Sequence, residues 1–74
     1  MIKVGTVVQF NENHYWCGCL GIITETKKLK GGNIRYMVGV PVPEHGTECI
    51  FVLNTDRAIE EIGRAVMVED RSDD

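Results

Sequence analysis

Turn-forming residues break this chain of 74 residues into five short apolar runs, and this punctuation constrains the fold more than any other feature. The runs are rich in β-branched and aromatic residues and occupy residues 3–10, 19–26, 34–42, 48–53 and 62–68. The third run alternates, with Ile34, Tyr36 and Val38 on one side and Arg35 and Met37 on the other. Such alternation is the period of a β-strand with one buried face. The pattern therefore predicts an all-β domain.

The segment between the fourth and fifth runs is the one place where a helix is expected. Asn54, Thr55 and Asp56 are all residue types that cap helices. We predict at most one short helical turn between residues 54 and 61. Periodicity alone does not separate a one-turn helix with a short strand from a turn with a long strand.

About five short strands have to hide the hydrogen-bonding groups at their edges, and a small closed barrel does so economically. We expect one barrel domain over residues 1–68, followed by a disordered acidic tail over 69–74. Gly21 opens the second strand, where a close backbone approach would require the missing Cβ. The predicted interior consists of Val4, Val8, Ile23, Val38, Val40, Phe51 and Val66.

The charge is unevenly distributed along the chain. The formal net charge is −3, and residues 69–74, with four acids and one base, account for all of it. The remaining body is neutral and lacks the positive surface of a general nucleic-acid binder. Its apolar runs are too short to span a membrane, and its first residues lack the apolar segment of a signal peptide. We therefore expect a cytoplasmic protein with reduced thiols.

Three segments together resemble a known family. Val8-Gln9-Phe10 precedes a loop, Gly18-Cys19-Leu20-Gly21-Ile22-Ile23 follows it, and Phe51-Val52-Leu53 precedes a polar turn. This arrangement resembles the SH3-like small β-barrels, especially those with the KOW-type Gly-x-x-Gly-x-Val step of transcription-elongation and ribosomal proteins. The resemblance implies a five-stranded barrel, and SH3-like barrels bind proline-rich and other peptides in an aromatic-lined groove. The chain is also similar in size and style to small phage and prophage accessory proteins.

Three consecutive rings, His14, Tyr15 and Trp16, follow the first run. Period-two alternation does not bury all three, so we expect at least one ring to face solvent as a binding surface. Trp16 remains open between this surface and a lid over the core, because Trp is highly buried on average. Barrel topology would bring Pro43 and His45 near these rings. The predicted partner-binding residues are His14, Tyr15, Trp16, Pro43 and His45.

The only positive cluster of the body lies around the turn between the second and third runs. It comprises Lys27, Lys28, Lys30 and Arg35. These residues form a candidate phosphate contact. The alternative, which we favour, is a solvated hairpin whose lysines discourage edge-to-edge aggregation. The rim loop of the nucleic-acid-binding barrels carries Lys and Arg, whereas the corresponding loop here has Glu12 and no base.

Three cysteines invite a metal or thiol-chemistry interpretation. Cys17 and Cys19 are separated by one residue and Cys49 is distant in sequence. Zinc-ligand pairs are separated by at least two residues, so we predict no metal site and no cofactor. We expect the thiols to act as small buried hydrophobes. A catalytic thiol would need a base, for which His14 or His45 could serve, and an orienting group that the sequence does not place.

These observations predict a non-catalytic protein-binding module with a protein or peptide as its partner and no membrane contact. Its binding surface would be the loop that carries His14, Tyr15 and Trp16, which we call the aromatic loop. The alternative is a small phage-derived accessory protein that binds a nucleotide or nucleic acid to interfere with a host system. The sequence also leaves a homo-oligomer open, since a sheet edge that no strand fills would pair with a neighbouring subunit.

Overall fold

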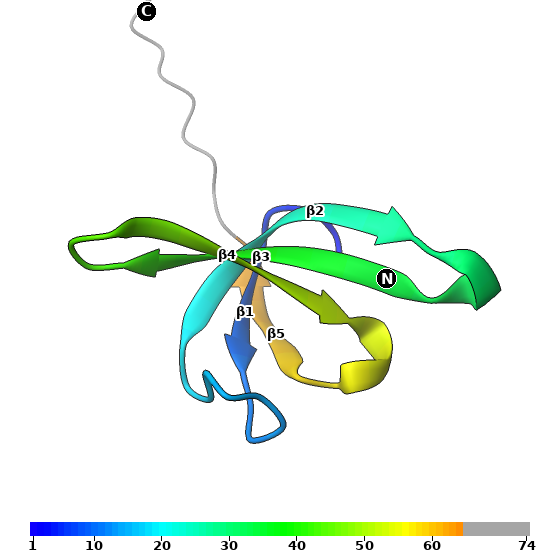
Figure 1. Cartoon of the computed structure of the whole chain (residues 1–74), viewed down its shortest axis with the longest axis horizontal. Helices are drawn as coiled ribbons and strands as arrows, with labels where there is room; N and C mark the ends of the chain where they lie inside the picture. The colour runs from blue at the N-terminus through cyan, green and yellow to red at the C-terminus, as the bar shows by residue number, and fades with distance from the viewer. Residues whose placement is uncertain (65–74) are drawn as a thin grey trace, which may run out of the picture.

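The structure is a computed structural model that describes residues 1–64. Five antiparallel strands make up this part of the chain, in the order β4-β3-β2-β1-β5. They are β1 (Thr6–Phe10), β2 (Leu20–Lys28), β3 (Ile34–Val42), β4 (Gly46–Leu53) and β5 (Ile59–Arg64). The all-β prediction is confirmed (Figure 1). The predicted end of the last strand, the core position Val66 and the acidic tail over 69–74 lie outside the described residues.

Two single 3₁₀ turns are the only helical elements among residues 1–64. The turn η2 (Asn54–Asp56) lies in the segment where one was predicted, and β5 begins three residues later. The helical turn is thus shorter than the predicted limit at residue 61, and the last strand begins at Ile59 rather than at residue 62 as expected. The other turn, η1 (Lys30–Gly32), comes earlier in the chain, in the glycine-rich connection between β2 and β3. Gly31 adopts a φ of 79° there. A glycine accommodates this left-handed conformation without strain.

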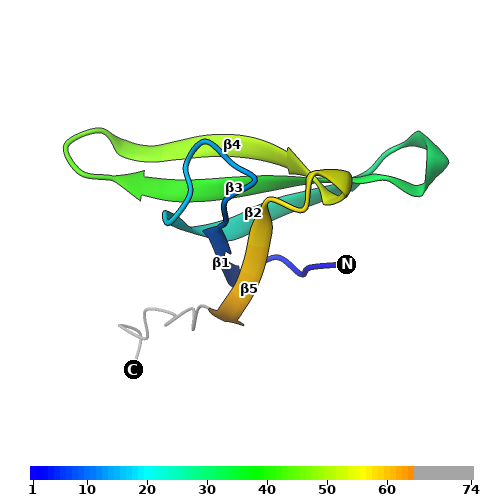
Figure 2. The same ribbon diagram turned by 90° about the horizontal axis from the view of Figure 1, so that it is seen from below.

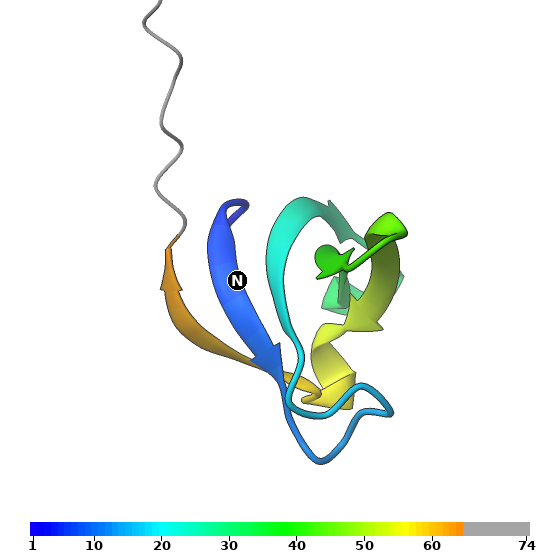
Figure 3. The same ribbon diagram turned by 90° about the vertical axis from the view of Figure 1, so that its left-hand side faces the viewer.

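The sheet is strongly curved and barrel-like in shape (Figure 3). β4 and β5 form its two edges, and η2 connects them across the open end of the curve. The hairpins β2–β3 and β3–β4 extend to opposite ends of the molecule, while β1 and β5 cross beneath them (Figures 1 and 2). β3 belongs to both hairpins and therefore connects the two ends of the molecule.

The core lies on the concave side of this curved sheet. Its buried apolar side chains are Val8, Phe10, Ile23, Tyr36, Val38, Val40, Val52 and Ala58. The predictions for Val8, Ile23, Val38 and Val40 are confirmed.

Two of the predicted core positions are wrong. Val4 precedes β1 and is 52% exposed. Phe51 pairs with Met37 and is 55% exposed, because the alternation of β4 turns Val52 inward and Phe51 to the convex face. Residues 50–53 are all apolar, so the sequence pattern did not show which face of β4 is buried.

Gly21 is the point where three strands converge. It is buried and pairs with Val8 of β1. A Cβ added here would lie 2.5 Å from Val38 Cγ1, 3.1 Å from Val40 Cγ2 and 3.1 Å from the Gly39 carbonyl oxygen of β3. The first of these distances is one that real Cβ atoms essentially never show, so any larger residue requires Val38 or its neighbours in β3 to shift.

We predict that Gly21→Ala lowers the free energy of unfolding by about 1–3 kcal/mol, the usual range for overpacking a core. Urea denaturation followed by circular dichroism measures the change. Gly63→Ala is the matched control, because a Cβ at that strand glycine meets no atom within 4 Å. Equal stability of the Gly21→Ala variant and the wild type would contradict the assigned crowding.

Candidate functional site

The loop between β1 and β2, residues 11–19, is built from consecutive turns. Backbone N–H groups of His14, Cys17 and Cys19 donate to carbonyls three residues earlier, at 3.0, 3.1 and 3.0 Å. At its base, the N–H of Gly18 donates to the Phe10 carbonyl at 2.8 Å. These bonds pair several backbone groups of the loop, as in an ordered loop.

Two asparagines fasten this loop to the chain just after η2. The side-chain amides of Asn11 and Asn13 both donate to the Arg57 carbonyl, each at 2.9 Å. The Asn11 N–H also donates to the Ala58 carbonyl at 2.9 Å. Arg57 presents its carbonyl from a left-handed conformation, with a φ of 51°. The aromatic loop is therefore held on the connection between β4 and β5.

His14 faces into the loop and not toward its rim. Its ring packs on the Phe10 ring, with centroids 4.4 Å apart. Its Nδ1 accepts a hydrogen bond from the Trp16 backbone N–H at 2.9 Å. His14 therefore supports Trp16 from inside the loop and, although it was predicted as a partner-binding residue, it does not line the groove described below. Hydrophobic periodicity does not reveal a local hydrogen bond of this kind, between the His14 side chain and the backbone two residues later.

Tyr15 and Trp16 have opposite environments. Tyr15 is 95% exposed, which confirms that at least one of the three rings faces solvent. Trp16 is half-buried and packs against the core, with its ring edge-on to Phe10 at 6.5 Å. Trp16 was expected either to cover the core or to lie on the binding surface, and it does both. One part of the indole contacts the core, and the rest faces the surface of the loop.

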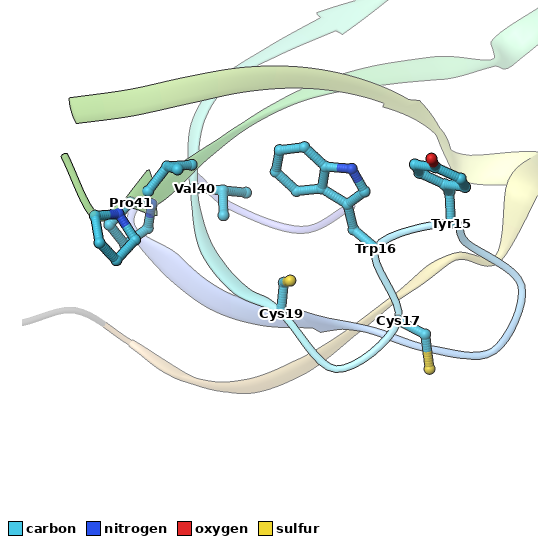
Figure 4. A pocket seen from close by; sticks show the side chains of 8 residues that line it. Tyr15, Trp16, Cys17, Cys19, Val40 and Pro41 are labelled. Atoms are coloured by element: carbon cyan, nitrogen blue, oxygen red, sulfur yellow. The ribbon is translucent and has the colours of Figure 1, made fainter. Parts of the chain in front are cut away.

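A groove of about 400 Å³ separates this loop from the end of β3 (Figure 4). We call it the aromatic groove; its walls are Tyr15, Trp16, Cys17, Cys19, Val40, Pro41, Val42 and Pro43. Tyr15, Trp16 and Pro43 are brought together as predicted. His45 lies in the exposed turn after Pro43 and is not among the lining residues. None of the eight side chains is charged, so the groove offers apolar surface.

Five of these wall residues were absent from the predicted site: Cys17, Cys19, Val40, Pro41 and Val42. The stiff Pro41-Val42-Pro43 segment was the available signal, but its distance from the aromatic loop depends on the curvature of the sheet. A smaller apolar depression of about 170 Å³ lies beyond Pro41, between Val7, Leu20, Gly21 and Ile22.

The predicted phosphate contact is not one uniform surface. Lys27, Lys28 and Lys30 are exposed at the far end of the β2–β3 hairpin. Arg35 is half-buried, and its guanidinium lies 4.5 Å above the centre of the Phe51 ring. This cation–π contact turns the arginine toward β4 and leaves three lysines at the hairpin end.

The cysteines are free and exposed, so the expectation of buried thiols is wrong. The Cys17 and Cys19 side chains point to opposite sides of the loop (Figure 4). Within residues 1–64 no three His, Cys, Asp or Glu side chains lie close enough to hold a metal ion. The same residues contain no helix with the length and apolar character to cross a membrane.

Comparisons with protein-family models, curated proteins and solved structures found no match to this chain.

We predict that Tyr15→Ala changes the free energy of unfolding by less than about 0.5 kcal/mol, as for most surface substitutions. Trp16→Ala should lower it by about 2 kcal/mol, roughly half the loss for a fully buried aromatic. Urea denaturation of both variants measures the difference. Equal effects of the two substitutions would contradict the division of roles within the loop.

We predict that all three cysteine thiols react with Ellman's reagent in the folded protein, because each is exposed. Absorbance titration should give the same thiol count with and without denaturant. A thiol that reacts only after unfolding would show that its side chain is buried.

Proposed function

We propose that this chain is a non-catalytic protein-binding module that holds an extended peptide in the aromatic groove. The observation that carries the proposal is Tyr15, a ring that is 95% exposed although backbone hydrogen bonds order the loop that carries it. An ordered loop that presents a bare tyrosine beside a half-buried tryptophan has the composition of a binding hot spot. Solvent-facing aromatics of this kind mark interaction sites.

Each wall of the groove has a locally restrained backbone or side chain before any partner arrives. Pro41 and Pro43 have fixed φ angles on one wall. On the other, Trp16 is held by the core and by the bond of its N–H to His14. A groove of this kind loses little conformational entropy on binding, which favours affinity for a short peptide. The uncharged lining favours an apolar or proline-containing sequence.

We further propose that the fold is an SH3-like small barrel. Support comes from the strand order, in which β1 lies between β2 and β5, and from the single 3₁₀ turn before β5. The long loop after β1 and the groove beside it occupy the place that the resemblance implies for peptide recognition. A cytoplasmic location and a phage origin belong to the same proposal and rest on the sequence alone.

The alternative function is binding of a nucleotide or nucleic acid to interfere with a host system. Its support is the group Lys27, Lys28 and Lys30 at the far end of the β2–β3 hairpin. Three exposed lysines on a neutral body give only weak, salt-sensitive attraction to phosphate. The groove, with its shaped apolar walls, is the stronger candidate.

We predict that short proline-rich peptides perturb the amide signals of Val40 and Val42 and the Trp16 indole in an NMR titration. Tyr15→Ala should weaken binding at least about tenfold, equivalent to ~1.4 kcal/mol. Lys27→Ala combined with Lys30→Ala should leave the affinity unchanged and serves as the control. Affinity should also change little with salt, whereas phosphate contacts weaken steeply.

Failure of every peptide in a proline-rich library to bind would contradict the proposal. Steeply salt-dependent binding of an oligonucleotide, abolished by the lysine substitutions, would support the alternative instead.

A further inference from the structure

The two edges of the sheet differ in how well they are protected. β5 pairs with β1 through a bulge between Val7 and Val8 and carries Glu60, Glu61 and Arg64. Bulges and charges are the devices that keep edge strands from pairing with other chains. β4 has eight residues in unbroken register with β3, no proline and a single charge, Glu48. Its outer edge is therefore regular and open to a further strand.

One hydrogen bond identifies which residues of β4 direct their backbone groups toward this open edge. The Leu53 N–H donates to Asp56 Oδ2 at 3.0 Å and so turns away from β3. In an antiparallel ladder, hydrogen-bonded and non-hydrogen-bonded pairs alternate. Phe51, Cys49 and Thr47 therefore also direct their N–H and C=O groups outward. Within residues 1–64 no neighbouring strand on that side receives them.

The side chains of the same residues lie on the convex face, opposite Met37, Gly39 and Pro41 of β3. Phe51 is 55% exposed, and the Arg35 guanidinium above its ring holds it in place. Cys49 is exposed as well. A strand added to this edge would gain main-chain hydrogen bonds and cover part of an exposed aromatic ring.

We propose that the β4 edge is a homodimer interface, in which β4 of a second copy pairs antiparallel about a twofold axis at Cys49. In this register Cys49 lies opposite Cys49 of the second copy, and Thr47 lies opposite Phe51 of the second copy. The three outward-facing residues other than Leu53, whose N–H is bonded to Asp56, are then paired in each strand. A shift of two residues in either direction leaves part of these groups without a partner.

The side-chain pattern agrees with this register. Residues directly opposite each other share a face, so convex-face side chains meet convex-face side chains and the two sheets become continuous. Glu48 falls opposite Ile50 of the second copy, so the two carboxylates do not face each other across the axis. A twofold contact is self-complementary, and every copy in solution carries the same open strand.

The end of the β3–β4 hairpin supplies a further reason for a third strand. Pairing of β3 with β2 ends at Gly39, whereas pairing with β4 continues through Pro41–Thr47 and Val42–Gly46. This projecting part is a two-stranded ribbon, an arrangement that is only marginally stable in water. Thr47 of each copy would gain a strand on its open side. The second copy thereby supports the ribbon that carries Pro41 and Pro43.

The test compares matched lysine substitutions on the two edges. Sedimentation equilibrium of the full chain should show a concentration-dependent rise to twice the mass of 8.3 kDa. Phe51→Lys should weaken this association at least about tenfold. Ile62→Lys, at a residue with nearly the same exposure (52%) on β5, should leave it unchanged. A wild type that stays monomeric throughout the micromolar range, or equal effects of both variants, would overturn the proposal.

A second measurement does not depend on the folding of the lysine variants. In the chain with Cys17→Ser and Cys19→Ser, only Cys49 remains to form a disulfide. Diamide, which accepts the two electrons and two protons, should link two copies through Cys49 within minutes, since the opposed Cα atoms would lie about 5.5 Å apart. Crosslinking no faster than for a chain that retains only Cys17 would contradict the register. Pairing of β4 with an added peptide strand but never with itself would also overturn the proposal.

Discussion

The structure depends most on the close approach of β2 and β3 at Gly21. Val38 and Val40 occupy the space where a side chain at this position would lie, and Val8 of β1 is its strand partner. Three strands therefore meet around one missing Cβ. Because Val40 also walls the aromatic groove, the same contact sets the distance between the end of β3 and the loop that carries Trp16.

The sequence pattern predicted a strand well where one of its faces is apolar and the other is more polar. β3 matches its predicted bounds, and the helical turn after β4 lies where the capping residues indicated. The register of β4 was not predictable in the same way. Its last four residues, 50–53, are all apolar, so alternation in the sequence did not decide whether Phe51 or Val52 faces the core.

The candidate site was only partly visible in the sequence, because its walls come from two distant segments. The exposed Tyr15 followed from counting rings in a polar loop. The inward turn of His14 did not, because it arises from a local bond to the Trp16 N–H and from contact with Phe10. The cysteines were expected inside by residue type alone, and exposed positions at the loop and on the convex face override that tendency.

The groove and the β4 edge involve different residues but share the β3–β4 hairpin. Pro41 and Pro43 line the groove, while the backbone N–H and C=O groups of Thr47, the strand partner of Pro41, face the open edge. A second copy paired with β4 would order the ribbon on which one groove wall stands. Binding in the groove and pairing at the edge would then strengthen each other by the same factor, because coupling free energies are reciprocal. A dimer would also present two grooves, so a partner with repeated peptide segments would gain affinity without any new contact.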